Sequence, residues 1–383
     1  MFGLKEHKHL GTLAPSHPNT LLSNMSPSTD IVPLPLPALP AQPLVSVLIA
    51  NYNYGHFIGR SLDSLLAQSY PHFEGIVCDD GSTDDSREVV ARYASRDARI
   101  RLLEKENGGV ASALNAAYHA SRGDVVCLLD ADDFFAPDKL EQVVACFKER
   151  PEIGLVLHAM QVVDSREQRR GRLPSYGRCE EGWLAETVCA RGGRWRSMPA
   201  SALTFRRTVA ERLFSIPEAS FRSEADGFLV MLAALLTKVA FLPETLASYR
   251  LHGANLTGTR HLDQAVVTRS LDALRRKNVA VNQRLTELGI DGQPLALADN
   301  LNYHEQRFML ALFEGAPRRD LLRAYRCLAR ALRADDLYPP ARKAGGLAAF
   351  GAAIFLPVAA RTVWLNRLLG ARGFRRVAQA LRC

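Results

Sequence analysis

The sequence predicts an α/β fold in which a mostly parallel sheet is flanked by helices and followed by a helical C-terminal region. Two patterns predict the sheet. Short runs of apolar and β-branched residues alternate with helical patterns of about a dozen residues, and several of these runs end in polar loops. The third observation is composition: of 383 residues, 47% are apolar and 23% are charged, so the chain can bury a large core.

The distribution of residue types divides the chain into three segments. We expect a disordered Pro-rich leader at 1–43, a folded α/β domain at 44–260 and a helical region at 261–383. The first residues lack the apolar stretch of a secretory signal, and the seven cysteines form no CxxC pair. These features favour a cytoplasmic protein with reduced thiols.

Four strands separated by helices are expected in the first part of the domain. The first is followed by Asn51-Tyr52-Asn53, the second by Asp79-Asp80, and the fourth by Asp130-Ala131-Asp132-Asp133. Ligands bind beyond the carboxyl ends of strands in such sheets, so these polar loops should face one crevice. The four strands are residues 45–50, 73–78, 100–103 and 125–129.

The second part of the domain has a less regular pattern. Residues 165–198 lose periodicity and are rich in arginine around Trp183 and Trp195. We expect a loop that faces the substrate there, with a solvated basic loop as the alternative. The other elements expected are a strand at 153–163, short strands at 202–205, 239–242 and 246–251, an apolar helix at 228–236, and helices from about 262 onward.

The acids Asp130, Asp132 and Asp133 directly follow a buried apolar strand. Such close carboxylates repel one another unless a cation joins them, and Mg²⁺ and Mn²⁺ prefer oxygen ligands. The alternative is that the acids cap the helix that begins near Pro137. The loops contain neither G-x-G-x-x-G nor a P-loop, which argues against dinucleotide enzymes and P-loop NTPases.

Several sequence blocks occur together in a fixed order. They are S-V-L-I-A-N-Y-N, D-D-G-S-T-D-D-S, N-G-G-V-A-S-A-L-N, L-L-D-A-D-D, E-A-D and Y-R-L-H-G-A-N, between about residues 44 and 258. The series resembles the family 2 glycosyltransferases of the GT-A fold, a Rossmann-like fold. The resemblance implies an inverting enzyme that takes a sugar from a nucleotide-diphospho-sugar, with a UDP-sugar as donor and Mn²⁺ or Mg²⁺ as cofactor.

The resemblance also assigns residues to the donor nucleotide. It implies that Ala50, Tyr52 and Asp80 lie against the nucleobase and ribose, with the Asp80 carboxylate accepting a hydrogen bond from the base. Asp79 belongs to the same loop, as a contact or as support for it. Asn115 lies on a later helix, as a sugar contact or alternatively as a structural residue.

For the metal and the diphosphate, the resemblance implies that Asp132 ligates the cation. Asp130 would face the ribose or the hydration shell of the cation, and Asp133 is the third acid. Arg250 and His252, in the block Y-R-L-H, would reach the diphosphate, and His252 would also reach the metal. A structural role is the alternative for His252.

Sugar transfer to a hydroxyl requires a base that removes its proton. The resemblance places this base at Asp226. Many relatives have Glu-Asp here, whereas this chain has Glu224-Ala225-Asp226, so Glu224 is the second candidate and helix capping is the alternative for both. Processive relatives carry Q-x-x-R-W after the base. Here Arg194-Trp195 precede Asp226, which predicts a single, non-processive transfer.

The end of the chain is basic and amphipathic. Residues 344–360 carry no charge, and residues 361–382 interleave arginines with large apolar side chains. This pattern predicts a helix on an anionic membrane, which the net charge of +8 also favours. A core helix with a solvated basic face and a membrane span are the alternatives. We expect a peripheral protein on the inner face of the cell membrane.

The function expected is metal-dependent sugar transfer to a hydroxyl of a glycan or lipid-linked acceptor in cell-surface polysaccharide biosynthesis, without a nucleic-acid partner. The alternative is a non-catalytic, membrane-associated scaffold that binds nucleotide-sugars. A sugar nucleotidyltransferase would need a glycine-rich, arginine-bearing loop where this chain has Asn51-Tyr52-Asn53.

Overall fold

The computed structural model describes residues 31–173, 178–252, 262–290 and 294–369. In the first part, strands and helices alternate, and the four predicted strands are confirmed to within one residue at each end. The elements are β1 (Val45–Asn51), α1 (Gly55–Leu66), β2 (Phe73–Asp79), α2 (Ser86–Ala94), β3 (Ile100–Glu104), α3 (Val110–Ala120), β4 (Val125–Leu128), β5 (Phe134–Phe135), α4 (Lys139–Glu149) and β6 (Ile153–Asp164).

The later elements end in a group of helices, as the sequence predicts from about residue 262. They are β7 (Arg169–Leu173), α5 (Ala185–Ala190), β8 (Thr204–Arg206), α6 (Arg207–Leu213), α7 (Ala225–Leu236), β9 (Lys238–Leu251), α8 (Gln264–Glu287), α9 (Leu301–Phe313), α10 (Arg318–Ala334), α11 (Pro340–Ala353) and α12 (Val358–Leu369), with short 3-10 helices η1 (Ala200–Ala202) and η2 (Leu297–Asp299).

The described strands form one nine-stranded sheet in the order β3-β2-β1-β4-β8-β6-β9-β5, and β7 pairs with β6. Strands β1, β2, β3, β4, β6 and β9 run in one direction and the other three in the opposite direction. The predicted α/β class with a mostly parallel sheet is therefore confirmed. Asn51 pairs with Asp79, and Leu48 pairs with Leu128, so the polar loops after β1, β2 and β4 leave the same edge of the sheet.

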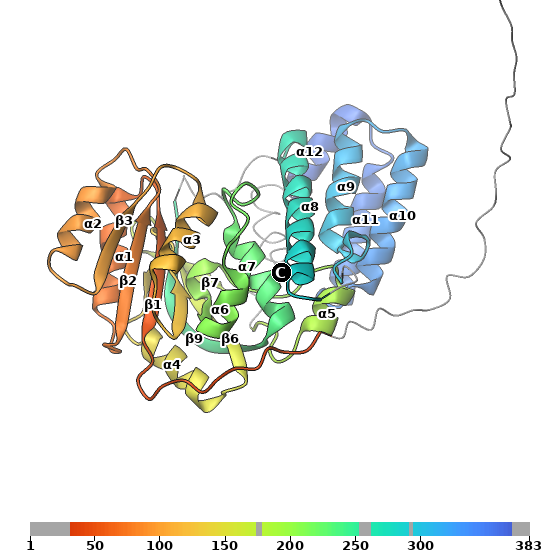
Figure 1. Ribbon diagram of the computed structural model, residues 1–383. Helices are drawn as coiled ribbons and strands as arrows, with labels where there is room; N and C mark the ends of the chain where they lie inside the picture. Colours follow the sequence, from red (N-terminus) through yellow and green to blue (C-terminus); the bar gives the residue numbers. More distant parts are fainter. Residues whose placement is uncertain (1–30, 174–177, 253–261, 291–293, 370–383) are drawn as a thin grey trace, which may run out of the picture.

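The interior is divided between two hydrophobic cores. The first surrounds the sheet and includes α7, of whose 12 residues ten are buried. A helix buried on nearly all sides carries its first turn into the interior of the protein. The second core lies among α9 to α12, and α8 joins the two, because Val267 packs in the second core and Val281 in the first. Figure 1 shows α8 to α12 at the opposite end of the molecule from α1 and α2.

Two expectations about irregular segments are corrected. The expected loop at 165–198 contains β7 and α5, and Trp195 is buried because it packs in the first core. The two short strands expected at 239–242 and 246–251 are one strand, β9, with shifts in its pairing to β6.

The leader expected to be disordered is packed against the fold from Ile31 onward. Ile31 is buried, and the Leu34 N–H donates a hydrogen bond of 2.8 Å to the carbonyl of Leu236. The earlier residues of the leader, 1–30, and the tail after Leu369 lie outside the described residues. Among the helices of the described ranges, none has both the length and the hydropathy of a membrane span.

Candidate active site

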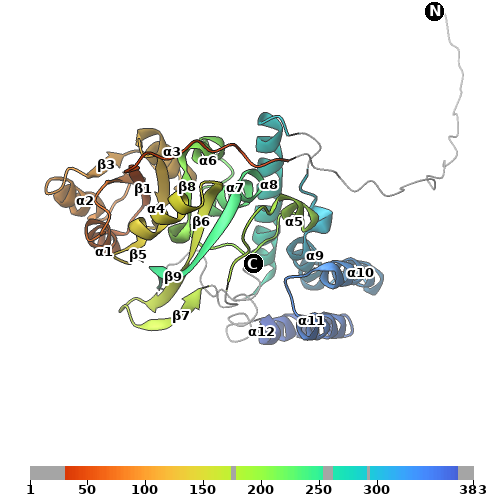
Figure 2. The ribbon, with the colours of Figure 1, turned by 90° about the horizontal axis from the view of Figure 1, so that it is seen from below.

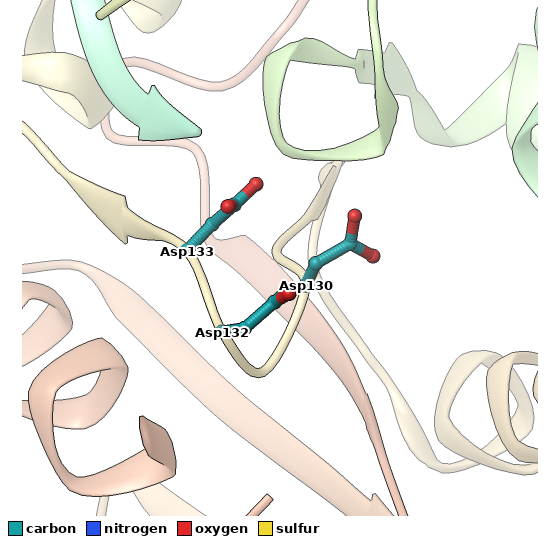
Figure 3. Close-up of side chains that lie close together, drawn as sticks. All are labelled: Asp130, Asp132 and Asp133. Carbon is teal, nitrogen blue, oxygen red and sulfur yellow. The ribbon is translucent and has the colours of Figure 1, made fainter. Parts of the chain in front are cut away.

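Three acids project from the loop between β4 and β5. Asp130, Asp132 and Asp133 each offer a carboxylate oxygen, and these oxygens all lie within 4.8 Å of one another. Figure 3 shows that the three side chains come from this single loop. The loop is held by its own backbone, since the Asp133 N–H donates to the Asp130 carbonyl at 3.0 Å, and by Ser61, whose hydroxyl donates to the Ala131 carbonyl at 2.8 Å. The carboxylates are thus fixed close together.

The Asp133 carboxylate is engaged within the protein. One oxygen accepts from the Ser201 hydroxyl at 2.6 Å, and the other accepts from the Arg250 N–H at 2.9 Å. Burial, and next the neighbouring Asp132, raise the pKa of Asp133 to about 8. Asp133 therefore connects the acidic loop to η1 and to the end of β9.

Asp132 lies against the end of β9. Antiparallel pairing of β5 with β9 sets Phe134 opposite Ser248, so the residues after Ser248 run beside the acidic loop. His252 Nε2 lies 2.8 Å from an Asp132 carboxylate oxygen, and the Arg250 side chain donates to the Asp132 carbonyl at 2.8 Å. The structure therefore brings together Asp132 and His252, two of the three residues predicted at the metal, the third being Asp130.

Negative charge is crowded around Asp130, and its pKa reflects this. Burial holds the pKa of the Asp130 carboxyl well above its ordinary value, and Asp133, Asp132 and Asp226 raise it further. The contribution of Asp226 indicates that this residue, almost 100 positions later in the chain, lies close enough for its charge to act on Asp130. Three carboxylates that penalise one another fit a divalent cation with oxygen ligands, because such a cation removes the repulsion.

Asp226 lies in the first turn of α7 and is half-buried. Burial raises its pKa, while the Gly227 N–H and the ammonium of Lys277 on α8 act in the opposite direction. Glu224 precedes the helix, is exposed, and has a φ of 61°, a left-handed conformation that costs a non-glycine residue about 1 kcal/mol. Of the two acids considered as the base, Asp226 is the one whose charge acts on Asp130 of the acidic loop.

The loop after β2 is held by a dense set of hydrogen bonds. The Asp80 carboxylate accepts from Lys105 Nζ at 2.9 Å and from the N–H groups of Gly108 and Gly109 at 2.9 and 2.6 Å. Gly109 has a φ of 92°, and a Cβ there would lie 2.6 Å from the Arg222 Cα, so only glycine fits. Asp80 thus joins the loop after β2 to the loop that opens α3.

Asp79 supports the same loop from within the sheet. Its carboxylate is fully buried and accepts from the Asn51 amide at 2.8 Å and from the Ser82 N–H at 2.8 Å. Beside it, Ala50 is partly exposed at the end of β1, and Tyr52 is 47% exposed. Tyr52 therefore presents an accessible aromatic ring at the same edge as Asp80.

Two residues predicted to contact the donor have side chains that are bonded to other groups of the protein. The Asn115 amide donates to the Ile216 carbonyl at 2.9 Å and accepts from the Ile216 N–H at 2.9 Å, so it fastens α3 to the segment before α7. The Arg250 guanidinium lies 5.0 Å from the ring centre of Phe57, and it donates to Glu167 at 3.0 Å. For both side chains, the contacts favour a role in positioning the loops around the site.

Several residues near the acids have no signal in the sequence. Ser201 in η1 accepts from the Asp130 N–H at 3.0 Å, and its own carbonyl accepts from Lys139 Nζ at 2.8 Å. Lys139 is fully buried, and its ammonium lies 3.4 Å from the ring centre of Phe135. Ser201 lies about 70 positions after the acids and belongs to no motif, so only the folded chain reveals its contact with them.

The chain was compared with known proteins. The model of the family "Glycosyl transferase family 2" matches residues 46–214. An uncharacterized glycosyltransferase of Nostoc sp. is 33% identical over 270 residues, which cover 69% of this chain and 82% of that protein. The chondroitin synthase of Pasteurella multocida is 42% identical over 107 residues, covering 28% of this chain and 11% of the synthase. The chain thus spans only a small part of that synthase.

The chain was also matched to solved structures, of which two are described. The crystal structure of S. aureus TarS 1-349 in complex with UDP is 17% identical, with a TM-score of 0.49, and the match covers 87% of this chain and 92% of that one. The mannosyltransferase PcManGT from Pyrobaculum calidifontis, in complex with GDP-Man and Mn²⁺, is 21% identical, with a TM-score of 0.46 and coverage of 88% and 89%.

Proposed function

Because the chain belongs to glycosyl transferase family 2, we propose that this glycosyltransferase moves one sugar from a nucleotide-diphospho-sugar, a UDP-sugar in the first instance, to a hydroxyl with inversion at the anomeric carbon. The proposal rests on the acidic loop and on Asp226, whose charge acts on Asp130. An acidic loop supplies a place for a metal-bound diphosphate, and a separate carboxylate supplies a base.

The donor nucleotide is proposed to lie across the edge formed by the loops after β1 and β2. The exposed ring of Tyr52 offers a stacking surface for the base. Asp80 is held in place by Lys105, Gly108 and Gly109, so its carboxylate has a fixed position from which to accept a base N–H. Ala50 leaves room for the ribose, and Asp79 keeps the loop in shape.

A Mn²⁺ or Mg²⁺ ion is proposed to be held by Asp132 and Asp130, with His252 at the side of Asp132. When bound, the ion neutralises the diphosphate that leaves with the nucleotide. Asp133 stays bonded to Ser201 and Arg250, and it positions the other two acids. The role of the protein at this point is to hold the diphosphate oxygens in one orientation.

The base is proposed to be Asp226. The acceptor hydroxyl forms a bond to the anomeric carbon while the bond from that carbon to the diphosphate oxygen breaks, and the hydroxyl proton passes to Asp226. Attack from the side opposite the diphosphate inverts the configuration. Burial, which raises the pKa of Asp226, also makes its carboxylate a stronger proton acceptor.

The first test is donor binding. A panel of nucleotide-sugars with and without MnCl₂ is expected to raise the thermal midpoint with one donor, and only when manganese is present. A panel that leaves the midpoint unchanged under both conditions would contradict the proposal. The product of the matching donor, analysed by NMR and mass spectrometry, is expected to have inverted anomeric configuration and a single added sugar.

The second test separates the base from the other acids. Asp226→Asn is expected to lower turnover by about 10²–10⁴-fold while donor affinity, measured by calorimetry, changes little, because the amide cannot accept the proton. Glu224→Gln is the matched control and is expected to keep most activity, since Glu224 is exposed. Equal losses of turnover and donor affinity in Asp226→Asn would assign it a structural role.

The acceptor class is also proposed, as a glycan or lipid-linked sugar of cell-surface polysaccharide biosynthesis at the inner face of the membrane. The similarity to a chondroitin synthase supports a glycan acceptor. The alternative is a scaffold that binds nucleotide-sugars without transferring the sugar. A chain that binds its donor with manganese but transfers to no acceptor, and hydrolyses no donor, would favour the scaffold.

A further inference from the structure

The positive charge of this chain is concentrated at its end. Residues 318–383 contain 14 of the 48 lysines and arginines but only three of the 40 acids, Asp320, Asp335 and Asp336. This segment therefore has a net charge of +11, whereas the rest of the chain has a net charge of −3 and the whole chain +8. From residue 337 to the end there is no acid. The anionic partner expected from the composition should thus bind this end of the molecule.

One face of α10 carries a row of arginines. The spacing of Arg319, Arg323, Arg326, Arg330 and Arg333 places them on a single side of the helix, and all five are exposed. Among the described residues none of the five has an ion-pair partner. The opposite side of α10 packs in the second core through buried leucines, namely Leu321, Leu328 and Leu332.

An apolar corner adjoins the beginning of this row. Phe355 is 66% exposed, Val358 52%, Val363 54% and Leu322 37%. These four are half of the eight large apolar side chains that are exposed in the described part of the chain, and they come from only α10, α12 and the turn after α11. Of the four, Leu322, Phe355 and Val358 form the apolar corner, and exposed apolar residues close together indicate an interaction surface.

The corner and the basic row are joined by contacts. The Arg318 guanidinium lies 4.4 Å from the ring centre of Phe355. A Cβ on Gly315, in the turn before α10, would lie 3.7 Å from the methyl carbons of Val358. Figure 2 shows α10, α11 and α12 together at the far end of the molecule from α2. The apolar side chains and the first arginines of α10 therefore belong to one surface.

We propose that this surface, the apolar corner of Leu322, Phe355 and Val358 with the arginine row of α10, docks on an anionic lipid bilayer. The arginines contact lipid headgroups, and the apolar side chains enter the boundary between headgroups and acyl chains. The inference extends the proposed action on a lipid-linked acceptor by naming the surface that would bring the enzyme to it. The surface is distinct from the tail after Leu369.

The pattern favours a bilayer over a soluble polyanion. An anionic glycan or nucleic acid would use the arginines but would gain nothing from exposed Phe355 and Val358. A bilayer uses both, because its surface is anionic and its interior is apolar. The absence of acids after residue 336 removes the repulsion that such a surface would otherwise create.

The test is sedimentation of the full-length chain with vesicles. Wild type is expected to bind vesicles of phosphatidylglycerol and phosphatidylcholine, to bind pure phosphatidylcholine vesicles much less, and to dissociate as NaCl is raised. Arg319→Gln with Arg323→Gln is expected to weaken binding by about ten- to thirtyfold, since each basic residue near the surface contributes about fivefold. Phe355→Ser with Val358→Ser is expected to weaken it by about tenfold.

The matched control is Arg92→Gln with Arg96→Gln. These arginines are exposed on and just after α2, at the other end of the molecule, so the control removes the same charge and should change binding less than about twofold. A third variant, Arg372→Gln with Arg375→Gln and Arg376→Gln, removes charge from the tail. All variants change exposed or tail residues, and thermal melting checks that each is folded.

Four results would overturn the inference. They are absence of binding to anionic vesicles, equal binding to neutral vesicles, loss of binding in the tail variant alone, and loss in the α10 variant without loss in Phe355→Ser with Val358→Ser. The last result would indicate a soluble polyanion. The vesicle assay needs no sugar transfer, and transfer to a water-soluble acceptor needs no vesicle, so failure of this inference and failure of the proposed function are measured separately.

Discussion

Two clusters of charged side chains in this protein differ in how their charge is balanced. In the acidic loop, Asp130, Asp132 and Asp133 lie within 4.8 Å of one another through their oxygens, and the charge of Asp226 acts on Asp130. The protein adds Arg250 and His252 at the border of this cluster, but burial, and next the neighbouring carboxylates, still raise the pKa of Asp130.

In the second cluster, arginines of the 191–196 segment neutralise the acids of the C-terminal helices. Arg194 and Asp335 form a buried ion pair, and both side chains are almost inaccessible to solvent. Arg191 pairs with Glu180 at 2.7 Å and with Asp336 at 2.5 Å. This cluster joins the domain that carries the sheet to the helical region.

The difference distinguishes a candidate ligand site from a structural contact between two parts of the chain. Charges that the protein pairs internally hold two parts of the chain together, and breaking one pair leaves the partner buried and unpaired. Charges that the protein leaves unbalanced are costly for folding, and such a cost is typical of a site that awaits a ligand. Variants in the two clusters should therefore have opposite effects on stability and on donor binding.

The largest effect is expected from Arg194→Met. The variant leaves Asp335 buried without its cation and should lower the free energy of unfolding by about 3–5 kcal/mol, measured by urea denaturation. Asp335→Asn in the same chain keeps the acceptor for the Leu337 and Tyr338 N–H groups and should recover part of the loss. Donor affinity of the folded fraction should stay the same. No recovery in the double variant would mean that the pair does not explain the loss.

The next largest effect is a pH dependence of the free energy of unfolding that is caused by Glu305 on α9. Burial raises the pKa of Glu305 from 4.5 to about 7, with Arg194 and Arg342 opposing the shift and Asp335 adding to it. Between these pH values the folded state binds more protons than the unfolded state. The contribution of Glu305 to the free energy of unfolding is therefore present at low pH and is lost as pH rises from about 4.5 to about 7.

Glu305→Gln is expected to remove this loss. Relative to the variant, wild type should lose roughly 2–3 kcal/mol between pH 4.5 and pH 8, because each unit of pKa shift corresponds to about 1.4 kcal/mol. Chemical denaturation of both proteins at a series of pH values measures the difference. A difference between the two proteins that is independent of pH would show that Glu305 titrates normally.

Asp130→Asn is expected to have a smaller effect of the opposite sign, because it should stabilise the protein. Without divalent metal at pH 8, the variant should be more stable than wild type by about 1 kcal/mol, because burial and the neighbouring acids penalise the charged carboxylate. Manganese-dependent donor binding should weaken by about tenfold or more. Calorimetric melting and donor titration measure the two effects. A variant that is both less stable and fully able to bind donor would show that Asp130 has a structural role.

The smallest effect is expected at an exposed ion pair. Arg178 lies 2.9 Å from Glu181, but its side chain is 66% exposed. Arg178→Gln should change the free energy of unfolding by less than about 0.5 kcal/mol, because water screens the pair. A loss as large as that of Arg194→Met would show that burial does not explain the difference between ion pairs in this chain.

The sequence predicted the sheet and the acidic loop because both depend on neighbouring residues. The apolar run before Asp130 requires a buried strand, and acids directly after such a strand must lie at its carboxyl end. The leader is a partial exception, since its proline-rich composition suggested disorder while Ile31 and Leu34 pack against the fold. Composition does not reveal which apolar residues find a partner in the folded chain.

Other features were decided only by tertiary structure, because they join residues far apart in the chain. Arg194 lies in an arginine-rich segment typical of a solvated loop, yet it pairs with Asp335, 141 positions later. Ser201 and Lys277 reach the surroundings of the acids from η1 and α8 without any motif. The sequence by itself determined the local chemistry, namely strand ends with carboxylates. The fold decided which of these charges are neutralised and which are left for a ligand, since that depends on distance in space.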